Sequence, residues 1–405
     1  MQSISCKQLA GEILAKCLAG QPPKTLPHCL LEAPCAQALF GTIVEPLADR
    51  FEPALCDTYV RLFAGALEAV GIEWDTGWDA LSLVARYERI RRPRPISVKP
   101  QRIVILSRVT LGADIAVTSV LLAAAKRRFP HAEIVFCGPA KNYELFAADR
   151  HIHHAPLEYR RGSLAERLQA ARELCRLLEG PPRAIVIDPD SRLTQLGMLP
   201  VCPEENYYFF ESRAYGGATD RSLPELTSEW AREILGGPPA RPFVALGNRS
   251  RKLGGIAVSL GVGDNPAKRL PDPFEAELLK LLAETGLPLT IDTGAGGEER
   301  DRVLRAIAAS GVAAATWEGS FSGFARIVAA SRLYVGYDSA GQHLAAACGV
   351  PLVSIFAGFP CERMFARWRP QGPQSQVIRV DEPDVEATLA RVREALRGTA
   401  TAAAE

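Results

Sequence analysis

The sequence predicts an α/β protein with two Rossmann-like domains preceded by an α-helical N-terminal module. Two observations predict the domains: beyond about residue 100 short apolar runs alternate with amphipathic stretches, and two groups of chain breakers, Pro93–Pro100 and Gly236–Pro239, divide the chain. The module is predicted because residues before 95 have helical spacing and no strand pattern. Alternating strands and helices are typical of parallel sheets.

Composition limits the function classes. The chain has 405 residues, 47% hydrophobic and 23% charged, which suits a folded protein of more than one domain. Its formal net charge of +1 argues against capture of nucleic acid by a broad basic surface. No apolar run reaches the roughly 18 residues of a membrane-spanning helix, and Met1–Gly20 lacks the pattern of a leader, so we expect a cytoplasmic protein. The ten cysteines include no Cys-x-x-Cys pair, and we expect reduced, mostly structural thiols.

Residues 1–95 are expected to form the helical module. Apolar residues between Leu47 and Leu67 recur every three or four positions, as on a helix buried on one face. The module ends in the segment 91–100, where three prolines prevent a continuing helix. Arginines in and around this segment indicate a solvated linker, and peripheral contact with anionic lipid or an anionic acceptor is the alternative.

Residues 101–236 are expected to form the first Rossmann-like domain. A β-branched run at 102–107 is followed by a loop with Gly112, a helix at 115–129 that Pro130 closes, and an apolar strand at 132–138. A helix at 164–178 and a strand at 183–188 continue the alternation. This order predicts a parallel sheet.

Residues 241–380 are expected to form the second Rossmann-like domain. Strands are predicted at 256–260, 287–292, 333–338 and 351–356, with a helix at 339–348. Another helix is predicted at 272–286, with Asp272 as N-cap, Pro273 at its first position and Glu275 at its third. Residues 381–405 are expected to form a C-terminal helix, 383–397, and a frayed alanine-rich tail.

The segment Gly336–His343 is the first candidate site, because it joins the end of an apolar strand to the start of a helix. Small residues at 339–341 let backbone amides approach an anion such as a diphosphate, which the helix dipole favours. Asp338 is then expected to face sugar hydroxyls. The alternative is ordinary N-capping by Asp338 or Ser339, with His343 on a packed helix face.

Three motifs occur in order along the chain. They are Arg108-x-x-Leu111-Gly112-x-Asp114, Lys268-Arg269-x-Pro271, and a C-terminal set of Asp338, Ser339, Gly341, His343, Leu344–Ala347, Gly349, Pro351, Phe356, Pro370 and Gly372. Together they resemble glycosyltransferase family 9, the lipopolysaccharide heptosyltransferase family, over residues 102–380. The resemblance implies a GT-B arrangement of the two domains and an inverting glycosyltransferase that uses a nucleotide sugar in the cleft between them. ADP-heptose is the donor that the resemblance implies.

Asp114 is the candidate catalytic base, because an acceptor hydroxyl must lose its proton as it attacks the anomeric carbon. Capping of a helix that starts at Ile115 is the alternative role. The resemblance places Arg108 and Gly112 on the acceptor side. The family usually reads Leu-Gly-Asp, whereas Ala113 here separates Gly112 from Asp114, and whether the inserted residue leaves Asp114 catalytic stays open.

The resemblance makes Lys268 the candidate for stabilising the negative charge that develops on the leaving diphosphate, together with the amides at Ser339, Ala340 and Gly341. Without the resemblance, an exposed loop lysine is an ordinary surface residue. Lys268 lies in the loop after the strand 256–260, and we include Gly263 and Asp264 of this loop among the donor-binding residues. Acidic residues bind ribose hydroxyls in Rossmann sites. The resemblance suggests such a glutamate after the strand 287–292 without choosing between Glu298 and Glu299.

We predict no metal ion and no cofactor beyond the donor substrate. Asp188-Pro189-Asp190 has the Asp-x-Asp form by which some glycosyltransferases hold a divalent cation, and His151, His153 and His154 are metal-ligand types on a predicted loop. The tripeptide is common by chance, and the resembled family works without metal. The motifs of P-loop NTPases and dinucleotide-binding dehydrogenases are absent from the sequence.

The sequence thus predicts transfer of a sugar to a glycan, lipid-linked or protein acceptor. The alternative is a catalytically silent sugar- or protein-binding module that keeps the fold and uses its helical N-terminus as the working surface. The acceptor, the donor sugar and base, and the oligomeric state stay open.

Overall fold

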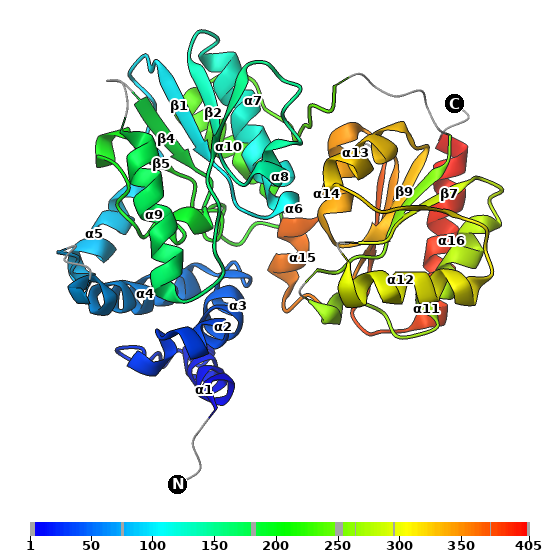
Figure 1. Ribbon diagram of the computed structural model, residues 1–405, viewed down its shortest axis with the longest axis horizontal. Helices are drawn as coiled ribbons and strands as arrows, with labels where there is room; N and C mark the ends of the chain where they lie inside the picture. The colour runs from blue at the N-terminus through cyan, green and yellow to red at the C-terminus, as the bar shows by residue number, and fades with distance from the viewer. Residues whose placement is uncertain are drawn as a thin grey trace. The chain divides into compact units, whose positions relative to one another are not determined.

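A computed structural model describes residues 5–73, 77–179, 184–247, 254–263, 265–294, 296–372 and 374–402. Their contacts divide the chain into two compact units. The first unit comprises residues 1–110, 120–142 and 151–240, and the second comprises 111–119, 143–150 and 241–405. In both units parallel strands alternate with helices, so the predicted α/β class with two Rossmann-like sheets is confirmed (Figure 1).

The first unit is built on a parallel sheet in the order β3-β2-β1-β4-β5. Its strands are β1 (Arg102–Leu106), β2 (Glu133–Gly138), β3 (Ile152–Pro156), β4 (Ala184–Asp188) and β5 (Tyr207–Phe209). The central strand β1 pairs Ile103 with Ile134 of β2 and with Ile185 of β4. These β-branched residues are buried because helices cover both faces of a parallel sheet.

Helices occupy the connections between these strands and the segment after β5. They are α7 (Ser119–Arg128), α8 (Ala140–Tyr143), α9 (Leu164–Leu178), α10 (Leu223–Leu235) and the 3₁₀ turns η5 (Arg192–Thr194) and η6 (Glu204–Asn206). Helix α9 has the predicted bounds, because Ser163 and Glu166 form a capping box that fixes its first turn.

The helical region predicted at 1–95 is present. It contains α1 (Cys6–Leu18), η1 (His28–Leu30), η2 (Ala33–Cys35), α2 (Ala36–Ala38), the π-helical η3 (Leu39–Val44), α3 (Glu45–Ala48), α4 (Pro53–Glu73) and α5 (Ala80–Ile90). Its apolar side chains share one core with α9 and with the strands of the first sheet; Phe63 and Leu67, for example, belong to the same cluster as Leu168 and Val186. These helices therefore cover one face of that sheet.

Two arginines of the predicted solvated linker at 91–100 contact the rest of the first unit, although Arg94 is exposed as predicted. Arg91 pairs with Asp57 at 2.9 Å and with Glu211 at 3.2 Å. Arg94 lies 4.1 Å from the ring centre of Tyr208 and donates to the Glu204 carbonyl at 2.9 Å. The prolines end α5 as predicted, but the chain then continues across the surface of the same unit.

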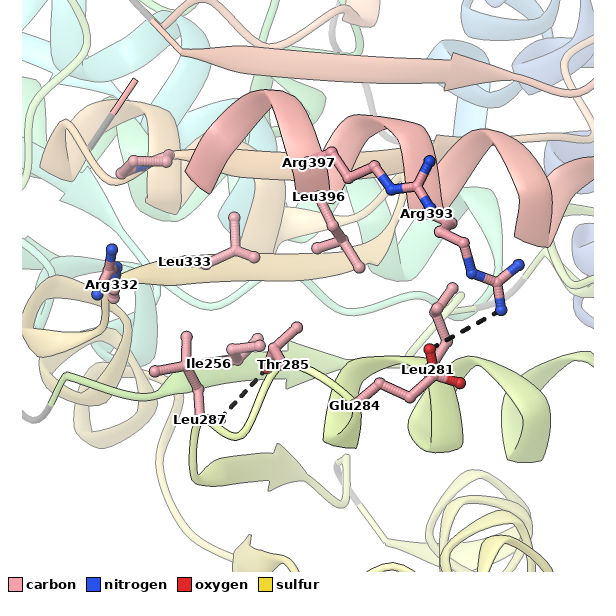
Figure 2. A pocket seen from close by; sticks show the side chains of 11 residues that line it. Ile256, Leu281, Glu284, Thr285, Leu287, Arg332, Leu333, Arg393, Leu396 and Arg397 are labelled. Atoms are coloured by element: carbon pink, nitrogen blue, oxygen red, sulfur yellow. Dashed lines mark hydrogen bonds and ion pairs between the residues drawn. The ribbon is translucent and has the colours of Figure 1, made fainter. Parts of the chain in front are cut away.

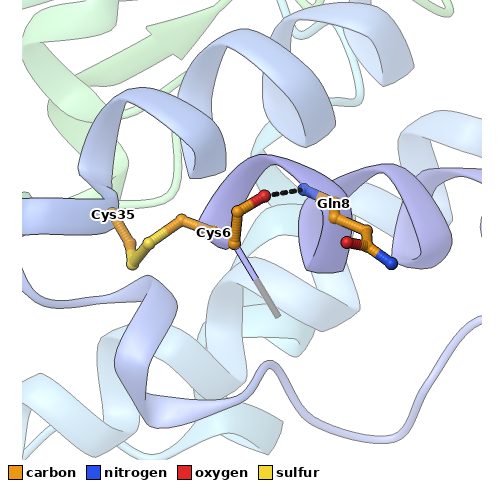
Figure 3. Close-up of a disulfide and its surroundings, with 4 residues drawn as sticks. Cys6, Gln8 and Cys35 are labelled. Atoms are coloured by element: carbon orange, nitrogen blue, oxygen red, sulfur yellow. Dashed lines mark hydrogen bonds between the residues drawn. A yellow bond between two sulfur atoms is a disulfide. The ribbon is translucent and has the colours of Figure 1, made fainter. Parts of the chain in front are cut away.

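The expectation of reduced thiols is wrong for one pair of cysteines. Cys6, in the first turn of α1, and Cys35, in the turn η2, form a disulfide across 29 residues of sequence (Figure 3). The other eight cysteines are free. No local pattern indicates the bond, because the pairing depends on how the short helical turns of residues 28–44 fold back onto α1.

The second unit has a parallel sheet in the order β11-β10-β9-β6-β7-β8. Its strands are β6 (Ile256–Ser259), β7 (Leu289–Asp292), β8 (Ala315–Trp317), β9 (Leu333–Tyr337), β10 (Leu352–Phe356) and β11 (Ser375–Arg379). Helices lie on both faces: α11 packs with α12 and α16 in one layer, and α13 packs with α14 in the other (Figure 1).

The helices of the second unit are α6 (Leu111–Ala113), the π-helical η4 (Asp114–Thr118), η7 (Pro266–Lys268), α11 (Phe274–Ala283), α12 (Gly297–Ser310), α13 (Phe321–Ala330), α14 (Ala340–Cys348), α15 (Glu362–Trp368) and α16 (Val385–Ala402). Helix α11 begins later than predicted. Its N-cap is Pro273, and the Asp272 side chain pairs with Arg269. Among the residues that the structure describes, no helix combines the length and the apolar character needed to cross a membrane.

Candidate functional site

The predicted donor residues Lys268 and Asp338 meet at one edge of the second sheet. Lys268 follows β6 and Asp338 follows β9, and these parallel strands are neighbours, so their carboxyl ends lie side by side. The Lys268 Nζ donates to Oδ2 of Asp338 at 2.8 Å and to its backbone oxygen at 3.1 Å. The Asp338 side chain is only 5% exposed and that of Lys268 17% exposed. The Lys268 side chain is thus held in place and is still partly exposed.

Gln342 holds the other oxygen of Asp338. Its Nε2 donates to Oδ1 of Asp338 and, at 3.2 Å, to the backbone oxygen of Trp368, while its Oε1 accepts from Ser354. Sequence reasoning missed this residue. Asp338 precedes α14, which begins at Ala340, so its contact with Gln342 depends on the turn before the helix and no local pattern marks it.

The N-terminus of α14 contains the small residues predicted to approach an anion. Ser339 is the N-cap and makes no capping hydrogen bond with its side chain, so the capping alternative for this residue is not observed. Ser339 and Ala340 are partly exposed, whereas Gly341 is buried. A Cβ atom on Gly341 would lie 2.1 Å from Oη of Tyr334, so this glycine is required by packing.

His343 lies on a packed face of α14, as the alternative to a ligand-binding role predicts. It is 5% exposed, and its ring meets that of Trp368 edge-on with 5.7 Å between centroids. Burial, helped by the nearby charge of Lys268 and opposed by Asp338, lowers the pKa of His343 to about 4. The imidazole is therefore neutral near pH 7.

Helix α6 approaches helix α14, which carries His343, closely. A Cβ atom on Gly112 would lie 3.2 Å from Cα of Ala340 and 3.4 Å from Cδ2 of His343. Helix α14 also contacts η4, the segment that contains Asp114. The structure thus brings the segment of the predicted base to the helix of the predicted donor site.

Asp114 is inside a helical segment and not at its start, since the segment begins at Leu111. The capping role at Ile115 is therefore not observed. The side chain is 0% exposed, and its Oδ1 accepts a hydrogen bond from Oγ1 of Thr118 at 2.6 Å. Ala113, the inserted residue, is buried at the end of α6, and the π-helical segment η4 follows it directly.

The structure distinguishes the two candidate glutamates. Glu299 lies beneath the loop after β6, where its Oε2 accepts from the backbone amide of Val262 at 3.2 Å. Glu298 is exposed on the first turn of α12. In the same loop Gly263 is exposed with a φ of +60°, and Asp264 lies outside the described residues.

Gly358 is a second residue that sequence reasoning missed. It follows β10 with a φ of +66°, and a Cβ atom there would lie 2.3 Å from the backbone oxygen of Ala267 and 2.7 Å from the amide nitrogen of Lys268. Only glycine permits this approach. Gly358 therefore supports the backbone that carries Lys268.

Arg108 belongs to the first unit. Its Nη1 donates to Oγ of Ser212 at 2.8 Å, and that hydroxyl donates to Asp190 at 2.8 Å. Asp190 also pairs with the buried Arg213 at 3.2 Å. The predicted acceptor-side arginine is thus oriented by a buried network that includes half of the Asp-x-Asp tripeptide.

Three of the candidate metal ligands, Asp188, Asp190 and His154, make hydrogen bonds within the first unit. Asp188 is buried, which raises its pKa to about 6, while hydrogen bonds from Thr194 and Tyr207 oppose the rise. The histidines at 153 and 154 lie on strand β3 and not on a loop, and Nε2 of His154 is 2.9 Å from the Gly138 carbonyl. Across the described part of the chain, no three metal-ligand side chains gather at one point.

Comparison with known proteins finds a family match within the second unit. Residues 255–392, which carry Lys268, Glu299 and Asp338, match the model of the family described as glycosyltransferase family 9 (heptosyltransferase). No curated protein matches the chain at the level of sequence.

Solved structures share the fold. The heptosyltransferase WaaC of E. coli, solved with ADP, has a TM-score of 0.57 at 19% identity, over 74% of this chain and 99% of its own. The ADP-heptose lipopolysaccharide heptosyltransferase II of E. coli gives 0.56 at 19% identity, over 75% of this chain and 100% of its own. A family 9 glycosyltransferase of Veillonella parvula has a TM-score of 0.56 at 15% identity, over 71% of this chain and 88% of its own.

These solved structures have the predicted GT-B-like fold, and the family match is independent of them. Residues 255–392 of the second unit are therefore similar in sequence to glycosyltransferase family 9, and the chain shares the GT-B-like fold of solved heptosyltransferases.

Proposed function

We propose that the protein transfers heptose from ADP-heptose to a hydroxyl group of a glycan acceptor, with inversion at the anomeric carbon. The observation that carries the proposal is the Lys268–Asp338 pair beside the N-terminus of α14, within the residues that match the family. The named neighbours include a protein solved with ADP and one described as an ADP-heptose lipopolysaccharide heptosyltransferase. A lipopolysaccharide core sugar is accordingly the first acceptor to test, before a lipid-linked or protein acceptor.

Lys268 is proposed to stabilise the leaving diphosphate. Negative charge grows on that group as the bond to the sugar breaks, and a fixed cation stabilises the transition state more than the ground state. The amides at the start of α14 are proposed to add partial positive charge. Asp338 is proposed to orient Lys268 and to accept hydrogen bonds from sugar hydroxyls.

Glu299 is proposed to bind the ribose of the donor, because it lies at the carboxyl edge of the sheet next to the loop that carries Lys268. Gly263 and Asp264 belong to that loop. No metal ion is proposed, since Lys268 and the helix amides supply the positive charge that a divalent cation would otherwise provide.

Asp114 is proposed as the general base. In this step its carboxylate accepts the proton of the acceptor hydroxyl, the acceptor oxygen forms a bond to the anomeric carbon, and the bond from that carbon to the diphosphate oxygen breaks. Thr118 orients the carboxylate through one oxygen. Because Asp114 is buried, the step requires the acceptor or a movement of η4 to bring the hydroxyl within hydrogen-bond reach.

That burial is also the observation that favours the alternative function, a catalytically silent sugar-binding module. A carboxylate that no acceptor reaches serves only the packing of its helix. Arg108 and Gly112 would then have no reacting acceptor to position.

The two functions are separated by an assay of donor turnover. The purified full chain is incubated with ADP-heptose and a lipopolysaccharide core acceptor, with and without EDTA, and the release of ADP and the mass of the acceptor are measured. The proposal expects acceptor-dependent ADP release that EDTA leaves unchanged. Donor binding without turnover would support the silent module, and activity that is lost on chelation and restored by Mg²⁺ would refute the metal-free mechanism.

A further inference from the structure

A cavity lies on the edge of the second sheet that is opposite to the proposed donor site. It has a volume of about 430 Å³. Ile256 and Leu333 are the first residues of β6 and β9, and Leu287 and Pro351 precede β7 and β10, so the cavity is at the amino ends of four neighbouring strands. Lys268 and Asp338 follow the carboxyl ends of β6 and β9. The cavity is therefore separate from the proposed donor site.

The wall of the cavity is apolar. Leucines come from the strand ends, from α11 and from the C-terminal helix α16. In Figure 2, Leu396 of α16 and Leu333 of β9 lie between helix α16 and the strands of the sheet. The volume is within the range of about 300–1,000 Å³ typical of small-molecule sites. Apolar walls of this extent favour a ligand with an apolar body.

The charged residues of the cavity are mostly cationic. Arg332, Arg393 and Arg397 line it, against the single acidic side chain of Glu284. All three arginines are exposed residues. Arg393 and Glu284 lie 3.9 Å apart across the opening between α16 and α11 (Figure 2). At that distance between exposed groups the pair is weak, and Arg393 remains available to an anion.

We infer that this cavity binds an amphiphilic anion, a molecule with an apolar body and one carboxylate-like head group. The body would occupy the space lined by Ile256, Leu287 and Leu333, and the head group would meet the arginines at the opening. Arginine suits this role because its guanidinium forms paired hydrogen bonds with a carboxylate. A simple inorganic anion would leave the apolar walls unfilled, and a neutral hydrocarbon would gain nothing from the arginines.

The test is calorimetric titration of the full chain with octanoate. Acetate, which has the charge without the body, and 1-octanol, which has the body without the charge, are the matched ligands. We expect saturable binding of octanoate. Acetate and 1-octanol should each bind at least about tenfold more weakly than octanoate. Equal affinity for octanoate and octanol would overturn the role of the arginines.

Variants of the lining arginines test whether octanoate binds in this cavity. Arg332→Gln combined with Arg393→Gln removes two cavity charges, and we expect it to weaken octanoate about tenfold or more. Arg305→Gln combined with Arg391→Gln removes the same charge from exposed positions outside the lining and should leave the affinity unchanged. Glu284→Gln should tighten binding, because it removes a repelling carboxylate. Absence of saturable binding, or equal weakening by both double variants, would refute the inference.

Discussion

The ammonium group of Lys268 lies 2.8 Å from Oδ2 of Asp338, and a second carboxylate oxygen of the same aspartate is held by Gln342. The two charged residues are 70 positions apart in the sequence and meet because β6 and β9 are adjacent parallel strands. Asp338 thereby fixes the direction of a cation that is still partly exposed. This relationship is the structural basis for assigning the leaving-group role to Lys268.

The Lys268→Met variant should lower kcat about 100-fold and change the KM for the donor much less. The reason is that charge on the diphosphate is greatest in the transition state, and loss of one such stabilising group typically costs two to three orders of magnitude. Lys280→Met, which removes an exposed lysine of α11, is the matched control and should be as active as the native protein. Steady-state kinetics with a varied donor concentration measure both constants, and a change confined to KM would exclude the transition-state role.

The neighbouring glutamates allow a paired test of donor binding. Glu299→Gln should weaken the affinity for ADP by about tenfold, because a charged hydrogen-bond acceptor for ribose is replaced by a neutral one. Glu298→Gln should have no effect, since that side chain is exposed on the outer side of the first turn of α12. Calorimetric titration with ADP decides the matter, and a larger loss for Glu298→Gln would reverse the assignment.

His343 should make the protein less stable as the pH falls. Its pKa in the folded state is about 4, lower than the value of about 6.5 for an unfolded chain, so between these values the unfolded state binds more protons. The free energy of unfolding therefore decreases from pH 6.5 toward pH 4, by roughly 3 kcal/mol for this group over the whole range. Its contribution is fully present above pH 6.5.

The measurement compares urea unfolding at pH 7 and pH 5 for the native protein and for His343→Gln. The difference between the two pH values should be smaller in the variant. His131→Gln, in which an exposed histidine is replaced, is the control and should keep the native difference. If His343→Gln also keeps that difference, burial of a neutral His343 does not contribute to the pH dependence.

The Cys6–Cys35 disulfide predicts a specific thiol count. Under denaturing conditions without reductant, eight of the ten cysteines should react with a thiol reagent, and all ten should react after reduction. In the Cys35→Ser variant the partner cysteine is released, so the nine remaining cysteines should react with or without reductant. Ten reactive thiols in the denatured wild-type protein without reductant would show that the bond is absent.

Much of the fold could be predicted because the local signals were strong. Helix Leu164–Leu178 has both a capping box and a regular apolar face, and the strands around Ile103, Val258 and Val335 are short, mostly apolar runs of typical length. The short strands β5 and β8, of three residues each, carry too little pattern to be recognised alone. Their place in the sheets depends on pairing with longer neighbours.

The candidate site likewise contains residues that the sequence indicates and residues that only the folded structure reveals. Asp338 and the small residues at the start of α14 were predicted because they join the end of an apolar strand to the start of a helix. Lys268 was predicted from the family resemblance, and the structure adds that the strands before Lys268 and Asp338 are neighbours. Gln342 and Gly358 act through contacts that depend on tertiary packing, so no local pattern marks them. The same holds for Arg94, whose side chain reaches Tyr208 more than 100 residues away.

The measurement that tests the proposed mechanism most directly is the rate of heptose transfer by the native chain and by Asp114→Asn. Asparagine keeps the size of the side chain and its contact with Thr118 but cannot accept the acceptor's proton. We predict a heptosylated product of inverted anomeric configuration from the native protein, a rate reduced about 100-fold or more in the variant, and equal ADP affinity in both. A native protein that forms no product from ADP-heptose, or an Asp114→Asn variant that transfers at the native rate, would contradict this mechanism.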